Sequence, residues 1–84
     1  MNYYVYILLC NDDSFYVGYT SNLKLRLANH NSGHGSDYLH SKLPVKMVYS
    51  EACESKEAAL KREKQIKNWS RVKKIKLINA DFRK

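Results

Sequence analysis

A run of aromatic and branched residues near the start of the chain most constrains the fold. Residues 3–10 read Tyr-Tyr-Val-Tyr-Ile-Leu-Leu-Cys, with no charged residue among them. Such a run is typical of a β-strand covered on both faces, because a half-exposed strand alternates apolar and polar residues. We therefore predict an interior strand, with other elements packed on both sides of its sheet.

A second strand is expected after a short polar turn. Residues 11–14 are turn formers and the strand pattern resumes at residues 15–20, which predicts a hairpin. If the loop has an odd number of residues, Tyr6 lies opposite Gly18 and shares a face with Tyr16. An even-numbered loop without a bulge would separate the two rings. Gly18 favours the odd register, because a position without a side chain leaves room for a ring and for a ligand.

The rest of the chain predicts three helices and a third strand. We expect the strand at Val45–Tyr49, extending toward Cys53, and a loop with at most a short turn near Tyr38–Lys42 before it. The helices are expected from a cap at Thr20 or Ser21 to about Asn31, from Ser55 to about Trp69, and from Ser70 to about Ala80. The order β-β-α-β-α-α indicates an α+β fold, with a small three-stranded antiparallel sheet flanked by helices.

The first helix places two polar side chains beside the core. Leu23 and Leu27 form its inward stripe, and Arg26 and His30 lie beside them, spaced i to i+4. Both can therefore face the sheet, while Leu25 points outward. Two simpler interpretations stay open, a surface salt bridge for Arg26 and a helix C-cap for His30.

An acidic residue lies where the second helix should be apolar. Glu63 falls between Ala59 and Ile66 in the inner stripe, whereas Glu57 faces away. An ionised carboxylate in that position is costly unless it is paired. It is either a partly solvated Glu bonded to a neighbouring Lys or Arg, or a metal ligand.

The positive charge is concentrated in the last third of the chain. Residues 56–84 carry 11 Lys or Arg against 3 acids, and residues 1–55 carry 4 against 5. Such a field favours a polyanion, nucleic acid or an anionic membrane surface, because binding releases counterions. On composition alone, a solvent-exposed, Lys-rich helix face explains the positive charge equally well.

Several function classes are disfavoured. Cys10 and Cys53 have no C-x-x-C partner, which argues against a disulfide framework or a zinc site, and His34 and His40 show no ligand spacing. No stretch is apolar enough for a signal peptide or a membrane span. We therefore expect one cytoplasmic domain over residues 1–84, with no membrane association and no protein partner.

Four ordered segments resemble the GIY-YIG nuclease superfamily, specifically its small stand-alone bacterial type. Residues 4–6, Tyr-Val-Tyr, resemble the GIY element, and residues 16–18, Tyr-Val-Gly, the YIG element. The segment from Asn22 to His30 resembles the part that carries the family's arginine and histidine. Residues 58–67 resemble the helix with its metal-binding glutamate.

The resemblance implies metal-dependent hydrolysis of DNA phosphodiester bonds. Glu63 would hold one Mg²⁺ (or Mn²⁺), and Arg26 would bind the phosphate. Tyr6 is the leading general base, Tyr16 would position the water or phosphate, and His30 could assist proton transfer. The DNA-binding residues would be Gly18, Lys61, Lys64, Lys67, Arg71, Lys73, Lys74 and Lys76.

The lysines and arginines would hold the DNA backbone without reading bases, which favours branched, flapped or damaged DNA over a defined sequence. Neither Asn68 nor Asn79 falls at the position of the family's asparagine, so no residue is assigned that role. Two other functions stay open. One is a nucleic-acid binding module that keeps the fold with little or no catalysis, and the other is an interaction adaptor with an incidentally basic helix.

Overall fold

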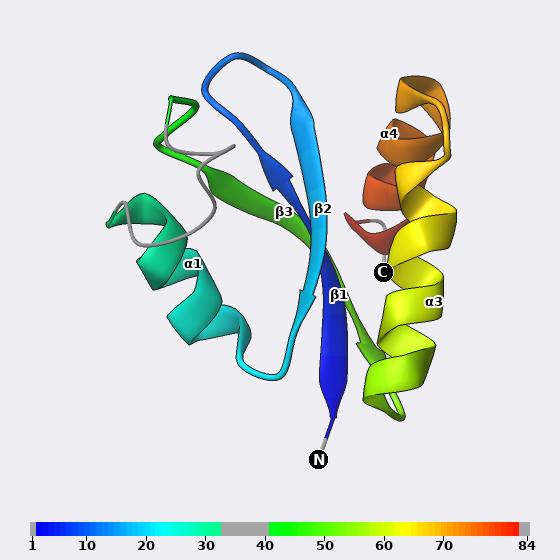
Figure 1. Ribbon diagram of the computed structural model, residues 1–84. Helices are drawn as coiled ribbons and strands as arrows, with labels where there is room; N and C mark the ends of the chain where they lie inside the picture. Colours follow the sequence, from blue (N-terminus) through cyan, green and yellow to red (C-terminus); the bar gives the residue numbers. More distant parts are fainter. Residues whose placement is uncertain (1, 33–40, 83–84) are drawn as a thin grey trace.

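A computed structural model of the chain describes residues 2–32 and 41–82, and the element order in these residues is the predicted β-β-α-β-α-α (Figure 1). The strands form one antiparallel sheet. The α+β prediction is therefore confirmed. The elements are β1 (Tyr3–Leu9), β2 (Phe15–Thr20), α1 (Leu23–Asn31), β3 (Lys46–Cys53), α3 (Lys56–Lys67) and α4 (Arg71–Phe82).

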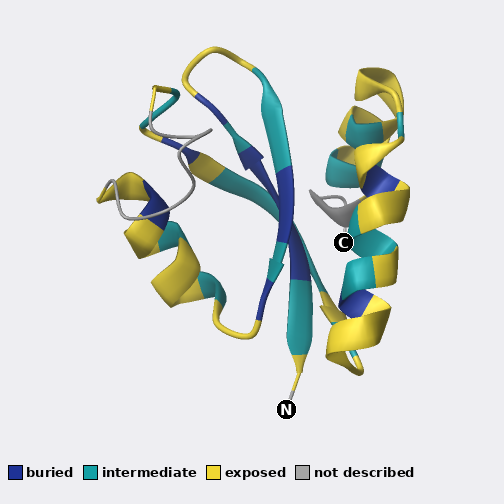
Figure 2. Cartoon of the chain, viewed as in Figure 1, coloured by how far each residue is buried: buried dark blue, intermediate teal, exposed yellow. Residues whose placement is uncertain are grey.

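The sheet separates two helical layers. Its strand order is β2-β1-β3, so β1 is the interior strand that its apolar sequence predicted. In Figure 1, α1 lies on one side of the sheet and α3 and α4 on the other. The darkest part of Figure 2, marking the buried residues, follows the middle of β1 and β2. Side chains of β1 therefore pack into a separate core on each face.

The two cores follow the alternation of β1. Val5 and Ile7 pack with Ala59 and Ile66 on the α3 face, and all four are fully buried. On the α1 face, Tyr6, Leu8, Cys10 and Val45 form the second core, with the half-buried Leu23 and Leu27 against it. The predicted inward stripes of both helices are thus confirmed, and Leu25 is exposed as expected.

The hairpin has the odd register on which the placement of the tyrosines depends. Tyr6 lies opposite Gly18 and Leu8 opposite Tyr16. The loop closes with the Cys10 amide donating to the Ser14 carbonyl at 2.8 Å, and Asp13 adopts a φ of 67°. A turn followed by one left-handed residue is a common geometry of three-residue hairpin loops.

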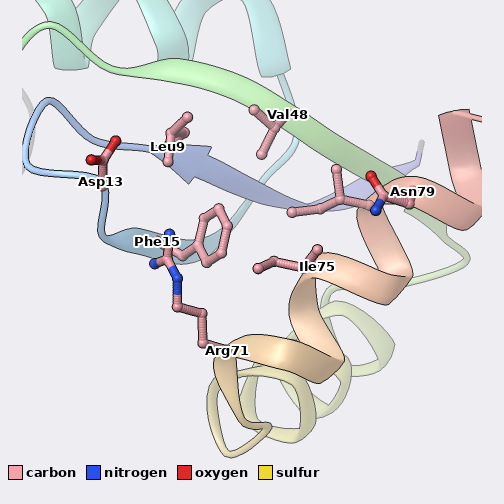
Figure 3. Close-up of a pocket in the computed structure, with 8 residues that line it drawn as sticks. Leu9, Asp13, Phe15, Val48, Arg71, Ile75 and Asn79 are labelled. Atoms are coloured by element: carbon pink, nitrogen blue, oxygen red, sulfur yellow. The ribbon is translucent and has the colours of Figure 1, made fainter.

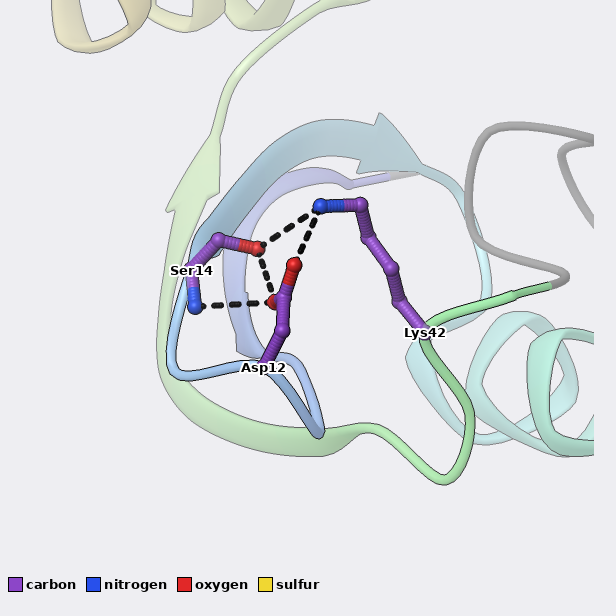
Figure 4. Close-up of polar contacts among 3 residues, drawn as sticks. All are labelled: Asp12, Ser14 and Lys42. Atoms are coloured by element: carbon purple, nitrogen blue, oxygen red, sulfur yellow. Dashed lines mark hydrogen bonds and ion pairs between the residues drawn. The ribbon is translucent and has the colours of Figure 1, made fainter.

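A polar cluster ties this loop to the segment before β3 (Figure 4). Asp12 accepts hydrogen bonds from the Ser14 amide at 3.1 Å and the Ser14 hydroxyl at 2.5 Å, and pairs with the Lys42 ammonium at 2.6 Å. Hydrogen bonds from Lys42 and Ser14 hold the pKa of Asp12 well below its usual range. The Asn11 amide adds a bond to the Lys42 carbonyl at 2.9 Å.

The expected cap of α1 was wrong by one or two residues. The N-cap is Asn22, whose side chain accepts from the Leu25 amide at 3.0 Å. Thr20 cannot cap the helix because it is still paired with Tyr4 in the sheet, and its hydroxyl accepts instead from the Asn22 amide at 3.1 Å.

The other caps are Ser55 and Ser70, as predicted, with the amides of Ala58 and Lys73 as donors. α3 ends at Lys67, slightly earlier than expected, with Asn68 as its C-cap.

The third strand begins one residue later than expected and runs to Cys53. A shift in its pairing with β1 leaves Val48 as an extra residue between Met47 and Tyr49, a β-bulge.

His34 and His40, and most of the turn expected near residues 38–42, lie outside the described residues. Across the described helices, no segment has the length and apolar character of a membrane span.

Candidate active site

The Tyr6 phenol is the centre of the candidate site. Its side chain is fully buried, and its hydroxyl lies 3.2 Å from His30 Nε2. The ring crosses the neighbouring strand at Gly18, where a Cβ atom would come within 2.6 Å of the Tyr6 oxygen. The odd register also brings the Tyr16 ring to a centroid distance of 6.5 Å from that of Tyr6. Gly18 therefore makes room for the Tyr6 ring, as its place in the sequence predicted.

His30 joins this cluster from α1. Its side chain is only 3% exposed, and its ring centroid lies 5.8 Å from Tyr16 and 6.3 Å from Tyr6. The C-cap of α1 is Ser32, so His30 is not the helix cap. Burial, with a further contribution from the charge of Arg26, lowers the pKa of His30. The imidazole is accordingly neutral at neutral pH and able to accept a proton.

The pKa of Tyr6 is shifted by its burial and by the ionisable side chains around it. Burial and the neighbouring Tyr16 raise it to about 12. The Arg26 guanidinium opposes the rise, and the Glu63 carboxylate adds to it. Arg26 and Glu63 thus both act on the same phenol, although they come from different helical layers.

Glu63 reaches this region from the other side of the sheet. Tyr6 packs on the α1 face, while α3 packs on the opposite face, against β1 and β2. Because β2 is an edge strand and the Tyr6 ring crosses it at Gly18, side chains from both layers can meet beside that edge. The Glu63 side chain is 13% exposed and pairs with Lys67 at 3.6 Å. The structure thus shows the partly solvated, paired carboxylate that was one of the two interpretations of the sequence.

The ligands available to a metal are few. The described residues contain no group of three His, Cys, Asp or Glu side chains able to hold an ion. A site with fewer than three such side chains does not suit zinc, which takes three or four protein ligands. It fits Mg²⁺, which keeps several waters and commonly uses one or two carboxylates with substrate phosphate oxygens. Glu63 would be that carboxylate.

The predicted DNA-binding lysines and arginines lie on α3 and α4. Lys61 and Lys64 are exposed and line a shallow depression on α3 with Arg62, Gln65 and Asn68. Lys67 is paired with Glu63, and Lys74 is half-buried. Lys73 lies 4.3 Å above the Trp69 ring, with Arg62 at 5.1 Å from the same ring, and Lys76 is exposed.

Arg71 lies apart from the Tyr6 cluster. Its guanidinium is 4.5 Å above the Phe15 ring, at the rim of a largely apolar hollow between the hairpin and α4 (Figure 3). Asn79 lines the same hollow, with Asp13 nearby, and Asn68 caps α3. Neither asparagine is among the groups that shift the pKa of Tyr6.

Sequence reasoning missed a second group of residues next to Arg26. Tyr3, Tyr19, Thr20, Ser21 and Lys56 surround a hollow of about 260 Å³ together with Arg26. The sequence signal was the alternation in β2, which puts Tyr19 on the face opposite Tyr16. That signal alone gave no reason to join Tyr19 with Lys56, which is over 30 residues away.

Comparisons with known proteins identify the family of this chain. The family model of the GIY-YIG catalytic domain matches residues 2–76. A UPF0213 protein of Staphylococcus haemolyticus is 47% identical over 76 residues, covering 90% of this chain and 93% of the relative. A UPF0213 protein of Natronomonas pharaonis is 44% identical, with 92% and 91% covered.

Two solved structures are similar as well. The solution NMR structure of a UPF0213 protein from Bacillus halodurans has a TM-score of 0.61 at 42% identity, covering 95% of this chain and 85% of that one. The solution NMR structure of a protein from E. faecalis has a TM-score of 0.66 at 36% identity, with 100% and 90% covered. The family match spans the strands, the hairpin and the helix of Glu63, and the chain therefore belongs to the GIY-YIG family.

Proposed function

We propose that this chain is an endonuclease that hydrolyses DNA phosphodiester bonds with a divalent metal ion. The observation that carries the proposal is the contact between a buried phenol and a buried imidazole, with the Tyr16 ring beside both. His30 contacts the Tyr6 hydroxyl, and the charges of Arg26 and Glu63 both act on it. A small core has no packing reason to gather a base, a cation and a carboxylate at one edge of its sheet.

The two charged residues have complementary roles. The Arg26 guanidinium would hold the scissile phosphate, whose charge grows in the transition state. Glu63 would hold Mg²⁺ or Mn²⁺, in keeping with the general dependence of GIY-YIG nucleases on divalent metals. Charge from such an ion stabilises the oxygen that leaves phosphorus when the ion is bound. The Lys67 contact involves only one oxygen of Glu63, Oε1, at 3.6 Å.

Tyr6 and His30 would move the proton together. A phenol with a pKa of about 12 is neutral at pH 7 and is a weak base by itself. The neutral His30 imidazole, 3.2 Å away, can take the phenol proton as the phenol oxygen takes one from the attacking water. The water oxygen then bonds to phosphorus as the bond to the leaving oxygen breaks. Tyr16, beside both rings, would position the water or the phosphate.

The DNA would lie along the basic side chains of α3 and α4. These lysines are suited to the phosphate backbone, which carries no sequence information directly. We therefore propose selection of DNA by its structure, with branched or damaged DNA as the substrate class.

A cleavage assay tests the proposal. Branched, single-stranded and duplex DNA are incubated with the protein in Mg²⁺, in Mn²⁺ and in a chelator. Cleavage should require metal, and Arg26→Ala should lower the rate at least 10²-fold, by analogy with the loss of one transition-state donor. Lys24→Ala, an exposed cation on the same helix, is the matched control and should stay near wild type.

A binding module without catalysis is the second candidate function. The observation in its favour is that Glu63 is paired with Lys67 and Tyr6 has a raised pKa, so neither is prepared for catalysis before metal binds. Salt-dependent DNA binding with no cleavage in either metal would favour this module. A lack of salt-dependent DNA binding would instead favour the adaptor.

A further inference from the structure

A polar hollow adjoins the candidate site at the end of β2. We call it the β2 hollow, defined by Tyr3, Tyr19, Thr20, Ser21, Arg26 and Lys56. Its volume is about 260 Å³. Arg26 belongs both to this hollow and to the surroundings of Tyr6, so the two sites are continuous. The other lining residues take no part in the proposed hydrolysis.

The charged side chains that line the β2 hollow are both positive. Arg26 comes from α1 and Lys56 from the first turn of α3, so both helical layers contribute a cation. No carboxylate lines the hollow. In the ion pairs found among the described residues, neither Arg26 nor Lys56 takes part. Two such cations facing one hollow favour an anion.

The aromatic part of the lining is fixed by the sheet. Tyr19 lies opposite Val5, which makes Tyr3 and Tyr19 diagonal neighbours on the α3 face. Both are half-buried and pack against the core that contains Val5. Their rings therefore form an aromatic wall with polar hydroxyl tips, which offers an apolar face for a sugar to pack against.

The remaining two residues differ in what they can offer. The Thr20 hydroxyl is engaged with the Asn22 backbone, accepting from the amide at 3.1 Å and donating to the carbonyl at 3.3 Å. Thr20 therefore acts as part of the wall. Ser21 is exposed, and its hydroxyl can donate to an anion.

We propose that the β2 hollow binds a second backbone phosphate of the DNA, next to the phosphate held by Arg26. Lys56 is its charge partner, and the rings of Tyr3 and Tyr19 pack against the intervening sugar. This assignment rests on the proposed function, because it takes Arg26 as the contact to the scissile phosphate. With the scissile phosphate at Arg26 and the next phosphate at Lys56, the direction of the DNA strand is fixed. The bond to be cleaved then lies at Tyr6.

Equilibrium binding without metal tests this assignment apart from catalysis. The anisotropy of a fluorescent DNA oligonucleotide is measured in a chelator over a range of salt. Lys56→Ala should weaken binding several-fold and reduce the slope of log K against log salt by about 0.7 to 0.9, the loss of one phosphate contact. Lys46→Ala removes the same charge from an exposed position on β3, at the other edge of the sheet, and should leave the slope unchanged.

Amide NMR shifts supply a readout that does not depend on any variant. Adding the oligonucleotide should shift the amides of Tyr19, Thr20 and Ser21, and inorganic phosphate at the same ionic strength should not. Equal slopes for Lys56→Ala and Lys46→Ala, or unshifted amides, would overturn the assignment even if cleavage is observed. Saturable shifts with inorganic phosphate would make the hollow a free-anion site and overturn it too. Several-fold weaker binding by Lys56→Ala, without any cleavage by the wild type, would support a phosphate site in the hollow and refute the nuclease.

Discussion

Replacing Gly18 by alanine tests the packing that holds the Tyr6 hydroxyl in place. The new Cβ would lie 2.6 Å from the Tyr6 oxygen, 2.7 Å from its Cζ and 3.2 Å from a Tyr16 ring carbon. Reaching an ordinary contact of 3.4 Å requires the phenol oxygen to move by about 0.8 Å. Tyr6 is fully buried, so its ring has no solvent to move into.

Two measurable effects follow. Overpacking of this kind costs about 1–3 kcal/mol, and each kcal/mol lowers the melting temperature of a domain this small by roughly 4–8 °C. Displacement of the hydroxyl from His30 should also reduce cleavage by about 10²-fold, the usual cost of a misplacement near 1 Å. Thermal unfolding by circular dichroism and a single-turnover cleavage rate measure the two effects.

The sign of the stability change makes the test decisive. Alanine in a strand is otherwise more stable than glycine by about 0.5–1 kcal/mol, so without the clash Gly18→Ala would stabilise the protein. Ser50→Ala, on the other strand flanking Tyr6, is the matched control and should change little. A Gly18→Ala protein that melts higher than wild type and cleaves normally would refute this account of Tyr6.

Two further predictions concern stability. The folded state lowers the pKa of His30, so below pH 6.5 the unfolded chain binds more protons there. Stability should therefore fall on acidification below that pH. His30→Gln should show a shallower fall of the melting temperature with pH than the wild type. Equal slopes for the two proteins would contradict the lowered pKa of His30. Glu51 accepts from the Tyr49 hydroxyl at 2.7 Å and from Arg62 at 3.0 Å. Glu51→Gln should cost about 1–2 kcal/mol in urea unfolding, and an unchanged midpoint would show that this network contributes nothing.

The parts of the site that depend on local pattern could be predicted from the sequence. The continuous apolar run placed β1 inside the sheet, and Gly18 favoured the odd hairpin register, which the structure confirms and which puts Tyr6 and Tyr16 on one face. Helical periodicity put Glu63 in the inner stripe of α3, where its side chain is 13% exposed. In each case the constraint lies within one element or one hairpin.

The parts that depend on how elements pack could not be predicted. The sequence does not state that β2 is an edge strand, yet that position is what lets Glu63 and Arg26 act on one phenol. The cap at Asn22 was missed because sheet pairing of Thr20 competes with capping. The β2 hollow joins the start of β1, the end of β2 and the first turns of two helices, and no periodicity connects these segments.

The single-turnover cleavage rate of Glu63→Gln in Mg²⁺ tests the central claim most directly. Glu57→Gln, an exposed carboxylate on the same helix, is the matched control. If Glu63 holds the catalytic metal, Glu63→Gln should lose at least 10²-fold in rate, while Glu57→Gln and the DNA affinity in chelator stay near wild type. Equal rates for the two variants would contradict the proposed metal site and the nuclease mechanism built on it.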